Sequence, residues 1–339
     1  MKDHDHDKSL SALLAAAALF VGGAAQAQQE PIERDICVFD IAGQMGPTMA
    51  AMKDWRAAAL KWGLKANLRV YTNEQVAAED LKAGQCDASL ITGLRARQFN
   101  KYAGTLDSIG ALPSMEHMKL ALRVLAHPSR AEQLTANSYE VIGIAPIGAA
   151  YLFVNDREIN SLAKAAGKKV AVLDFDPTQA KMVAAAGATP VPSDITNFAG
   201  KFNNGSVDVI AAPLVAYNVL ELYKGLQPDG GIIDYPLLQL SIQLVGKEDR
   251  FPAEIAQKSR EYFYKNLDQV LEQLERESSQ VNSKWWVDIP DDDKREYEVM
   301  MQDARDQLRN EGYYDPDMLD LLRKIRCKLN SARAECTAG

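Results

Sequence analysis

The chain has 339 residues, of which 47% are hydrophobic, 25% charged and 7% aromatic. This composition excludes a disordered chain, which would be less apolar, and a fibrous chain, which would be richer in Gly and Pro. The 38 basic and 46 acidic residues give a formal net charge of −8, which argues against nucleic-acid binding. The length suffices for a full hydrophobic core and indicates about two domains.

The first predicted element is a targeting segment. Residues 10–25 read LSALLAAAALFVGGAA, which contains no charge and is shorter than the roughly 20 residues of a membrane span. The small-x-small pattern Ala25-Gln26-Ala27 follows, so we predict a secretory signal peptide over residues 1–27, cleaved after Ala27, and a periplasmic mature chain. The leader MKDHDHDK lacks the usual positive charge, and a retained membrane anchor is the alternative interpretation.

Export favours disulfides for the four cysteines. Cys327 and Cys336 enclose a short polar segment near the carboxyl terminus and form a natural pair. Cys37 lies in the first predicted strand and Cys86 opens the third; in a sheet of order 2-1-3 these strands are neighbours, which makes a Cys37–Cys86 bond feasible. Neither a CxxC motif nor a close His pair is present, so we expect no metal site.

Short β-rich runs alternate with helical runs between residues 35 and 245. Most of the β-rich runs are continuously apolar, which is typical of strands buried on both faces of a parallel sheet. The alternation favours an α/β architecture with right-handed crossovers. The predicted strands are Ile36–Ile41, Leu68–Thr72, Ala88–Thr92, Val141–Ala145, Tyr151–Asn155, Lys169–Leu173, Val207–Ala212 and Leu237–Val245.

The βα pattern occurs in two blocks, and the run from Tyr235 to Val245 is long enough to pass between them. After Phe251 the chain reads as charged helices, one of which begins at Pro290 with acidic residues in its first turn. We therefore predict a two-lobed periplasmic-binding-protein-like fold, with two doubly wound sheets joined by crossing strands. The expected parts are lobe I (28–146 plus about 235–250), lobe II (147–234) and carboxyl-terminal helices that pack on both lobes (251–339).

Two such lobes would enclose a hinged cleft at the carboxyl ends of their strands, where open α/β sheets bind ligands. The sequence shows no Walker loop, G-x-S-x-G elbow, GxGxxG or HExxH motif. Export, two lobes and the lack of such motifs favour a solute-binding protein without a cofactor over an enzyme.

Several short motifs follow one another in a fixed order over roughly residues 80–310. They are Gly84-Gln85-Cys86-Asp87, Leu112-Pro113, Gly167-Lys168-Lys169, Gly205-Ser206-Val207-Asp208 and Trp286-Val287-Asp288-Ile289-Pro290. This order resembles that of the extracytoplasmic solute receptors of TRAP transporters. The resemblance implies capture of a small molecule and a membrane permease as the partner.

The chain departs from that resemblance at the ligand clamp. TRAP receptors usually carry an Arg in the strand after Gly-x-Lys, which binds a ligand carboxylate through a bidentate fork. Here that position is Ala171, and a second basic contact would fall near Gly148-Ala149-Ala150. The departure weakens the expectation of an organic acid and opens the alternative of a neutral or cationic ligand.

A second resemblance covers almost the whole mature chain. It is carried by Cys37-Val38-Phe39-Asp40, by residues 93–99 (GLRARQF), by residues 193–205 (SDITNFAGKFNNG) and by Ile325-Arg326-Cys327-Lys328. These segments are similar to AdeT-type periplasmic proteins, a group named as components of RND multidrug efflux. The alternative function is thus an accessory protein of RND efflux, with efflux components as partners and a role in antibiotic resistance. An RND adaptor would need a coiled-coil hairpin and lipoyl-like β structure, so we favour the solute receptor.

The candidate ligand residues of the first block follow two predicted strands. Asp40 could accept a hydrogen bond from a ligand or satisfy its own turn, and Phe39 is more typical of the core than of a stacking surface. Arg95 and Arg97 could bind an anion, could be surface charges, or one of them could pair with Asp40 to hold the lobe.

The candidates of the second block surround its predicted strands. Asp174 and Asp176 flank Phe175 and would suit a cation, although Asp176 before Pro177 is better placed as a helix N-cap. Asn197 and Tyr217 could line the rim or wall of the cleft, or be a surface amide and a core tyrosine. Gln239 in the crossing strand could face cleft or solvent, and Trp285 and Trp286 fit carboxyl-terminal packing. The predicted ligand residues are Phe39, Asp40, Arg95, Arg97, Asp174, Asn197, Tyr217 and Gln239.

Overall fold

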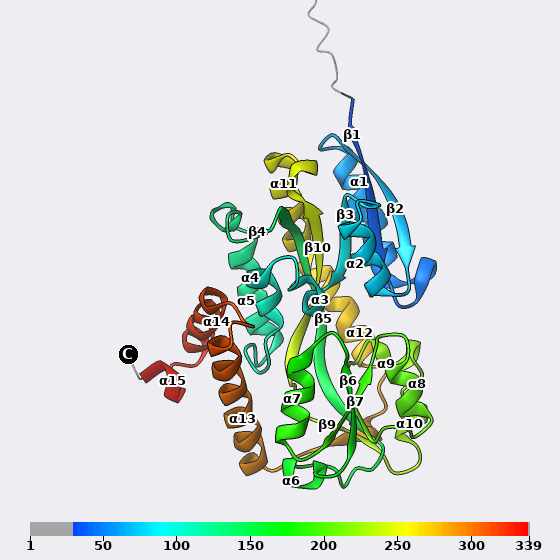
Figure 1. Cartoon of the computed structure of the whole chain (residues 1–339), viewed down its shortest axis with the longest axis vertical. Coiled ribbons are helices and arrows are strands. Elements are labelled where there is room, and N and C mark those ends of the chain that lie inside the picture. The colour runs from blue at the N-terminus through cyan, green and yellow to red at the C-terminus, as the bar shows by residue number, and fades with distance from the viewer. Residues whose placement is uncertain (1–29, 338–339) are drawn as a thin grey trace, which may run out of the picture. The chain divides into compact units, whose positions relative to one another are not determined.

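The structure is a computed structural model that describes residues 30–337, and the signal peptide expected over residues 1–27 lies outside them. Residues 31–339 form one compact unit. Its strands make an 11-stranded mixed sheet in which the order of the main path is β2-β1-β3-β10-β5-β8-β6-β7 (Figure 1). The strands are β1 (Ile32–Phe39), β2 (Leu64–Tyr71), β3 (Ala88–Thr92), β4 (Thr135–Ala136), β5 (Tyr139–Val154), β6 (Lys169–Leu173), β7 (Thr189–Ser193), β8 (Val209–Pro213), β9 (Gly231–Ile233), β10 (Leu238–Lys247) and β11 (Trp286–Val287).

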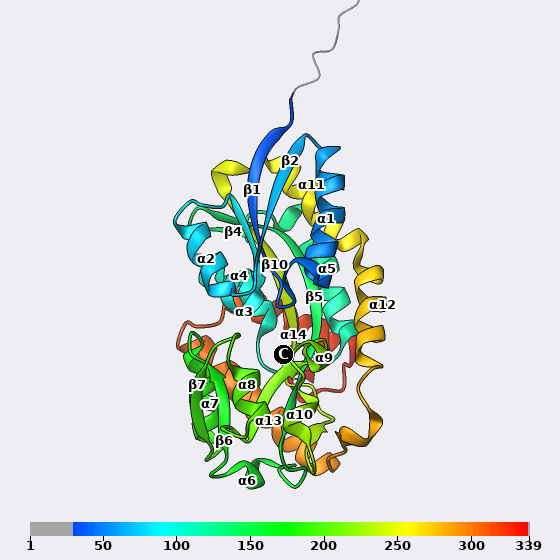
Figure 2. The ribbon, with the colours of Figure 1, turned by 90° about the vertical axis from the view of Figure 1, so that its right-hand side faces the viewer.

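Helices cover both faces of this sheet (Figures 1 and 2). They are α1 (Pro47–Leu60), α2 (Glu74–Lys82), α3 (Gly93–Ala96), α4 (Lys101–Gly104), α5 (Met115–Leu125), α6 (Leu162–Ala165), α7 (Pro177–Ala185), α8 (Phe198–Asn203), α9 (Ala216–Val219), α10 (Tyr223–Leu226), α11 (Ala253–Lys265), α12 (Leu267–Ser278), α13 (Asp291–Asn310), α14 (Pro316–Leu329) and α15 (Ala334–Thr337). The predicted α/β architecture is confirmed, and β3 and β6 have the predicted bounds. None of the helices in the described part of the chain is long and apolar enough to cross a membrane.

Two long strands join the halves of the sheet. We call the side with β1, β2 and β3 the first half, and the side with β6, β7, β8 and β9 the second half. The predicted crossing strand is β10, which pairs antiparallel with β3 and also with β5. The two predicted sheets are therefore two halves of one hydrogen-bonded sheet.

The sequence wrongly predicts two separate strands where the single strand β5 runs. Pro146 and Gly148 are residues that usually end a strand. Here β10 pairs with β5 on both sides of them, so the strand continues. The ladder accommodates the irregularity by a register shift, because Leu240 lies opposite Gly148 while the next residue, Ser241, lies opposite Pro146. The short strands β4, β7, β9 and β11 were also missed: β4, β9 and β11 have only two or three residues, and prolines interrupt β7.

Alternating residues of each strand enter different cores, as the pleat of a β-strand requires. In the first half, Cys37 and Ile91 lie in a core under α2 and α5, whereas Val38 and Leu90 lie in a core under α1 and α11. The second half repeats this arrangement. Phe153 packs toward α8 and α10, while its neighbour Val154 packs toward α13.

The carboxyl-terminal segment is helical as predicted, and its helices contact both halves. Met318 and Leu322 of α14 lie in a first-half core, and Tyr297 and Met301 of α13 in a second-half core. α13 begins after Pro290 with three Asp in its first turn, where the helix dipole favours negative charge. Both predicted disulfides are present, Cys37–Cys86 and Cys327–Cys336.

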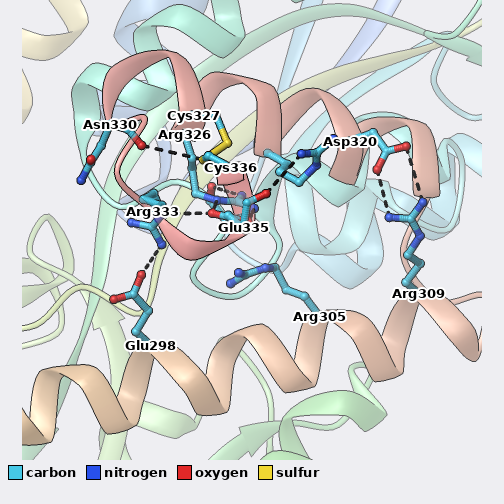
Figure 3. Close-up of polar contacts among 12 residues, drawn as sticks. Glu298, Arg305, Arg309, Asp320, Arg326, Cys327, Asn330, Arg333, Glu335 and Cys336 are labelled. Atoms are coloured by element: carbon cyan, nitrogen blue, oxygen red, sulfur yellow. Dashed lines mark hydrogen bonds and ion pairs between the residues drawn. A yellow bond between two sulfur atoms is a disulfide. The ribbon is translucent and has the colours of Figure 1, made fainter. Parts of the chain in front are cut away.

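Ion pairs fasten the last helix beside the second disulfide (Figure 3). Glu335 of α15 pairs with Arg326 of α14 at 2.6 Å and with Arg333 at 2.9 Å, and Arg333 also contacts Glu298 of α13. The carboxyl group is half-buried, and although burial opposes ionisation, hydrogen bonds and charge from Arg326 and Arg333 lower the pKa of Glu335 to about 2. Burial, together with the charges of the same arginines, lowers the pKa of Arg305 to about 10.

Candidate functional site

A cavity of about 520 Å³ lies where the two halves meet. Four strands end at it, β1 at Phe39, β3 at Thr92, β6 at Leu173 and β8 at Pro213. Carboxyl ends of strands are where open α/β sheets bind ligands, so the cavity occupies the place that the predicted topology assigns to the cleft. Its further lining residues include Ile41, Met45, Leu94, Ile147, Ala171, Val172, Ile195, Phe198, Leu214, Val219, Leu220, Leu238 and Leu240.

Asp40 lines this cavity, but its carboxylate is already engaged by the local backbone. One oxygen accepts a hydrogen bond from the Ala42 N–H at 2.9 Å and the other from the Met49 N–H in the first turn of α1 at 2.8 Å. Gly46 passes so close to the carboxylate that a Cβ there would collide with it. Asp40 thus shapes the loop that carries Met45, which corresponds to the turn interpretation, and Phe39 beside it is buried and also lines the cavity.

Arg95 does not line the cavity, because buried partners hold its guanidinium. Its Nε lies 3.2 Å from a carboxylate oxygen of Glu74, and the guanidinium stacks at 3.8 Å over the ring of Phe175 from the second half. Glu74 also accepts hydrogen bonds from the N–H and the hydroxyl of Thr92. The charge of Glu74 is therefore compensated, although this side chain reaches the cavity wall.

Arg97 takes part in a second contact between the halves. Its guanidinium donates to the Gly104 carbonyl at 3.0 Å and to the Tyr313 hydroxyl at 2.7 Å, and that hydroxyl donates to Asp176 at 2.9 Å. Asp176 caps α7 through the Thr178 N–H, so the expected N-cap role is confirmed. We call this chain of side chains, Arg97–Tyr313–Asp176, the clasp.

The other predicted ligand residues lie outside the lining of the cavity. Asp174 is exposed at the end of β6, and Asn197 accepts a hydrogen bond from the Asp194 N–H. Tyr217 is a core residue whose hydroxyl accepts from Trp285 Nε1 at 3.0 Å. Gln239 lies on the opposite side of β10 from Leu238 and Leu240 and lines a different hollow near α12.

The lining includes Ala171, the position where the TRAP resemblance places an arginine. Among residues 30–337, no Lys, Arg or His side chain lines the cavity. A bidentate carboxylate clamp is therefore absent from the described wall, as the sequence predicts. Its polar groups are Asp40, Thr48, Glu74, Thr92, Gln179, Asn218, Glu277 and Gln280.

A smaller hollow of about 280 Å³ adjoins the cavity and shares several lining residues with it, among them Pro47, Ile147 and Glu277. Its walls come from α1, α11 and α12, and Figure 2 shows α12 running beside β5 toward the second half. Glu277 could not be predicted from the sequence, because a single acid in a charged helix carries no signal of its own. Met45 could not be predicted either, because one methionine in a loop carries no signal; this residue is 91% exposed and lines the cavity.

Within the described residues, one group of side chains meets the spacing of a metal site, Cys37, Asp80 and Cys86. The two cysteines are joined in a disulfide and are thus not available as thiolate ligands. We assign no metal to this group.

A two-halved α/β sheet with a cavity at the carboxyl ends of its strands is the architecture of periplasmic-binding-protein-type receptors. Among solved structures, the chain is similar to a TRAP periplasmic solute binding protein from Desulfovibrio salexigens with bound orotic acid, with a TM-score of 0.73 and 13% identity over 88% of this chain and 99% of that one. A TRAP protein from Xanthobacter autotrophicus with bound β-D-galacturonate matches with a TM-score of 0.70 and 16% identity, over 86% of this chain and 99% of that one. Another, from Shewanella oneidensis with bound succinate, matches with a TM-score of 0.69 and 11% identity, over 87% of this chain and 99% of that one.

The sequence profile of the family described as "Solute-binding protein AdeT 1/2" matches residues 15–339. The chain is 45% identical to "Probable solute-binding protein AdeT1" of Acinetobacter baumannii over 88% of its length and 98% of that protein. It is 28% identical to "Probable solute-binding protein AdeT2" of the same organism over 69% and 98%. The chain belongs to the AdeT 1/2 family of solute-binding proteins.

Proposed function

We propose that this protein is an exported, periplasmic solute-binding protein that captures a small molecule in the cavity between its halves and performs no catalysis. The observation that carries the proposal is the cavity of about 520 Å³ at the carboxyl ends of β1, β3, β6 and β8. Family membership and the receptor fold support it. Delivery of the solute to a TRAP-like membrane permease completes the proposal.

The bound molecules named for the similar TRAP receptors include orotic acid, galacturonate and succinate, which are carboxylic acids. The cavity of this chain offers Ala171 and no basic side chain among its described lining residues. The solute therefore differs in chemical class from those acids. The efflux alternative gains no support from the fold, since α11 and α12 pack on β5, α14 packs on α5, and α13 contributes Tyr297 and Met301 to a second-half core.

Binding can be tested by thermal unfolding of the purified protein against a broad library of small metabolites. A ligand at about 100 times its Kd stabilises the folded state by about 2.7 kcal/mol, so a true ligand raises Tm measurably. Ala171→Trp fills the cavity and should abolish the shift, while Ala184→Trp places the same ring on an exposed position of α7 and should preserve it. Equal shifts in both variants would contradict the proposed site.

A further inference from the structure

We propose that the solute is an organic cation, an apolar body that carries a protonated amine or quaternary ammonium group, with Glu277 as its counter-ion. This inference deepens the proposed function and rests on it. Three observations carry it: the apolar wall, the sign of the charge in that wall, and the position of Glu277.

The wall favours an apolar body. Leu238 and Leu240 of β10, Leu173 of β6 and Leu214 present branched side chains to the same space, and the ring of Phe198 faces it from α8. Burying such surface together with a ligand's hydrocarbon stabilises a complex by about 25 cal/mol per Å² of apolar area removed from water. A small, highly polar solute would cover little of this apolar surface and would therefore gain little from its burial.

The charged side chains that line the cavity in the described chain are all negative. They are Asp40, Glu74 and Glu277, and the adjoining hollow adds Asp54. An anion that enters would lose hydration, and every charged side chain of the described wall is a carboxylate, so the anion's charge would be unfavourable in a largely apolar enclosure. A cation would lose the same hydration but meet opposite charge.

Of these carboxylates, Glu277 is the one suited to pair with a ligand. The oxygens of Asp40 are held by two backbone N–H groups, and Glu74 already pairs with Arg95. Glu277 forms no ion pair with any residue in 30–337; Gln273 donates to its Oε1 at 2.9 Å, and no described donor is bonded to Oε2. Asp54 is exposed on α1.

The position of Glu277 sets how a ligand would lie. The residue is half-buried near the end of α12 and lines both the cavity and the adjoining hollow. A cationic group beside its carboxylate can thus extend an apolar body toward Leu214 and Leu240 on one side or toward Trp55 on the other. The rings of Phe39 and Phe198 add surfaces that attract cations.

The experiment uses three probes with one apolar body, 4-phenylbutylamine, 4-phenylbutan-1-ol and 4-phenylbutyrate, measured by isothermal titration at pH 7. We expect the purified protein to bind the amine at least about tenfold more tightly than the alcohol, and the carboxylate most weakly. Glu277→Gln should weaken amine binding by about tenfold and leave alcohol binding within about twofold, since only the charge is removed. Glu272→Gln, an exposed acid on the same helix, is the matched control and should change neither.

A gain of function provides a second, independent measurement. Ala171→Arg places a guanidinium in the wall of the cavity and should reverse the order, so that 4-phenylbutyrate binds better than the amine. This variant also tests whether the probes occupy the cavity.

The outcomes separate the inference from the proposed function. If the alcohol or the carboxylate binds as tightly as the amine, or if Glu277→Gln leaves amine binding unchanged, the cation inference is overturned while the solute-binding function stands. If no probe binds and no library compound shifts Tm, the proposed function fails as well.

Discussion

At the scale of single residues, the most informative side chain besides the cavity is the buried carboxyl of Asp107. It accepts hydrogen bonds from the hydroxyl of Ser241 at 2.6 Å and from the Ser241 N–H at 2.9 Å. Burial raises the pKa of Asp107 to about 7, although the Ser241 hydrogen bonds and the charge of Arg97 oppose this rise. Asp107 is thus hydrogen-bonded to the crossing strand β10 and feels the charge of Arg97 in the clasp.

This shift predicts a particular dependence of stability on pH. The folded pKa lies above the ordinary value of 3.8, so between about pH 4 and pH 7 the unfolded chain releases a proton that the folded chain retains. The contribution of Asp107 is therefore fully present below about pH 4 and is lost as pH rises to about 7, by about 4 kcal/mol in total. Urea unfolding at several pH values measures it.

Asp107→Asn provides the comparison, because an amide does not titrate but can still pair with Ser241. We expect the unfolding free energy of the natural chain, minus that of Asp107→Asn, to fall with rising pH over this window. Asp303→Asn, on an exposed position of α13, should give no such difference. Parallel pH curves for Asp107→Asn and the natural chain would contradict the assignment.

The arginines show why single residues are hard to assign from sequence. The pattern placed Arg95 and Arg97 correctly just after β3, at the edge of the sheet where the cavity lies. Their guanidinium groups are instead held by Glu74, by Phe175 and by Tyr313, which lies 216 positions from Arg97. A partner as distant in sequence as Tyr313 cannot be recognised from the residues around Arg97. The missing arginine at Ala171 could be recognised, because that position belongs to a motif that usually contains one.

At the scale of elements, the clasp determines how firmly α7 is held. Tyr313 follows Gly312, whose positive φ of 73° ends α13 and turns the chain toward Arg97. Tyr313→Phe keeps the ring over the Arg97 guanidinium but removes the hydroxyl that joins it to Asp176. Because one partner of that bond is charged, we expect a loss of about 1.5 kcal/mol.

Native-state hydrogen exchange measures this effect locally. The amides in the first turn of α7 should exchange about tenfold faster in Tyr313→Phe, since that turn is where Asp176 is anchored. Tyr264→Phe removes a phenol hydroxyl from a side chain of α11 that is 37% exposed and serves as the control. Unchanged exchange in α7 of Tyr313→Phe would show that the clasp contributes nothing.

The strands show which elements a sequence specifies. The runs that became β3 and β6 were predicted with their bounds, because each has an apolar, β-rich centre, Leu90-Ile91 in β3 and residues 170–173 in β6. β5 was divided because Pro146 and Gly148 interrupt its apolar run, whereas pairing with β10 continues on both sides of this interruption. The apolar lining residues share the composition of the core, so no pattern distinguishes Leu240 at the cavity from Leu244 in the interior.

At the scale of the whole molecule, the two disulfides constrain segments of very different length. Cys37 and Cys86 are separated by 49 positions and join β1 to the start of β3, whereas Cys327 and Cys336 are separated by only 9. A cross-link stabilises the folded state mainly by restricting the unfolded chain, and the effect grows with the logarithm of the loop length. The Cys37–Cys86 disulfide should therefore stabilise the folded state more than the Cys327–Cys336 disulfide, because it closes the longer loop.

Replacing both cysteines of a pair by alanine tests this expectation. Cys37→Ala with Cys86→Ala should lower the free energy of unfolding by about 4 kcal/mol, and Cys327→Ala with Cys336→Ala by about 2.5 kcal/mol. Urea unfolding without reductant gives both values, and the natural chain under full reduction should lose about their sum, because the disulfides join different elements, β1 to the start of β3 and α14 to α15. A larger loss from the Cys327–Cys336 pair would mean that it acts mainly by holding Glu335 against Arg326, an effect that Glu335→Gln with the disulfide intact would then reproduce.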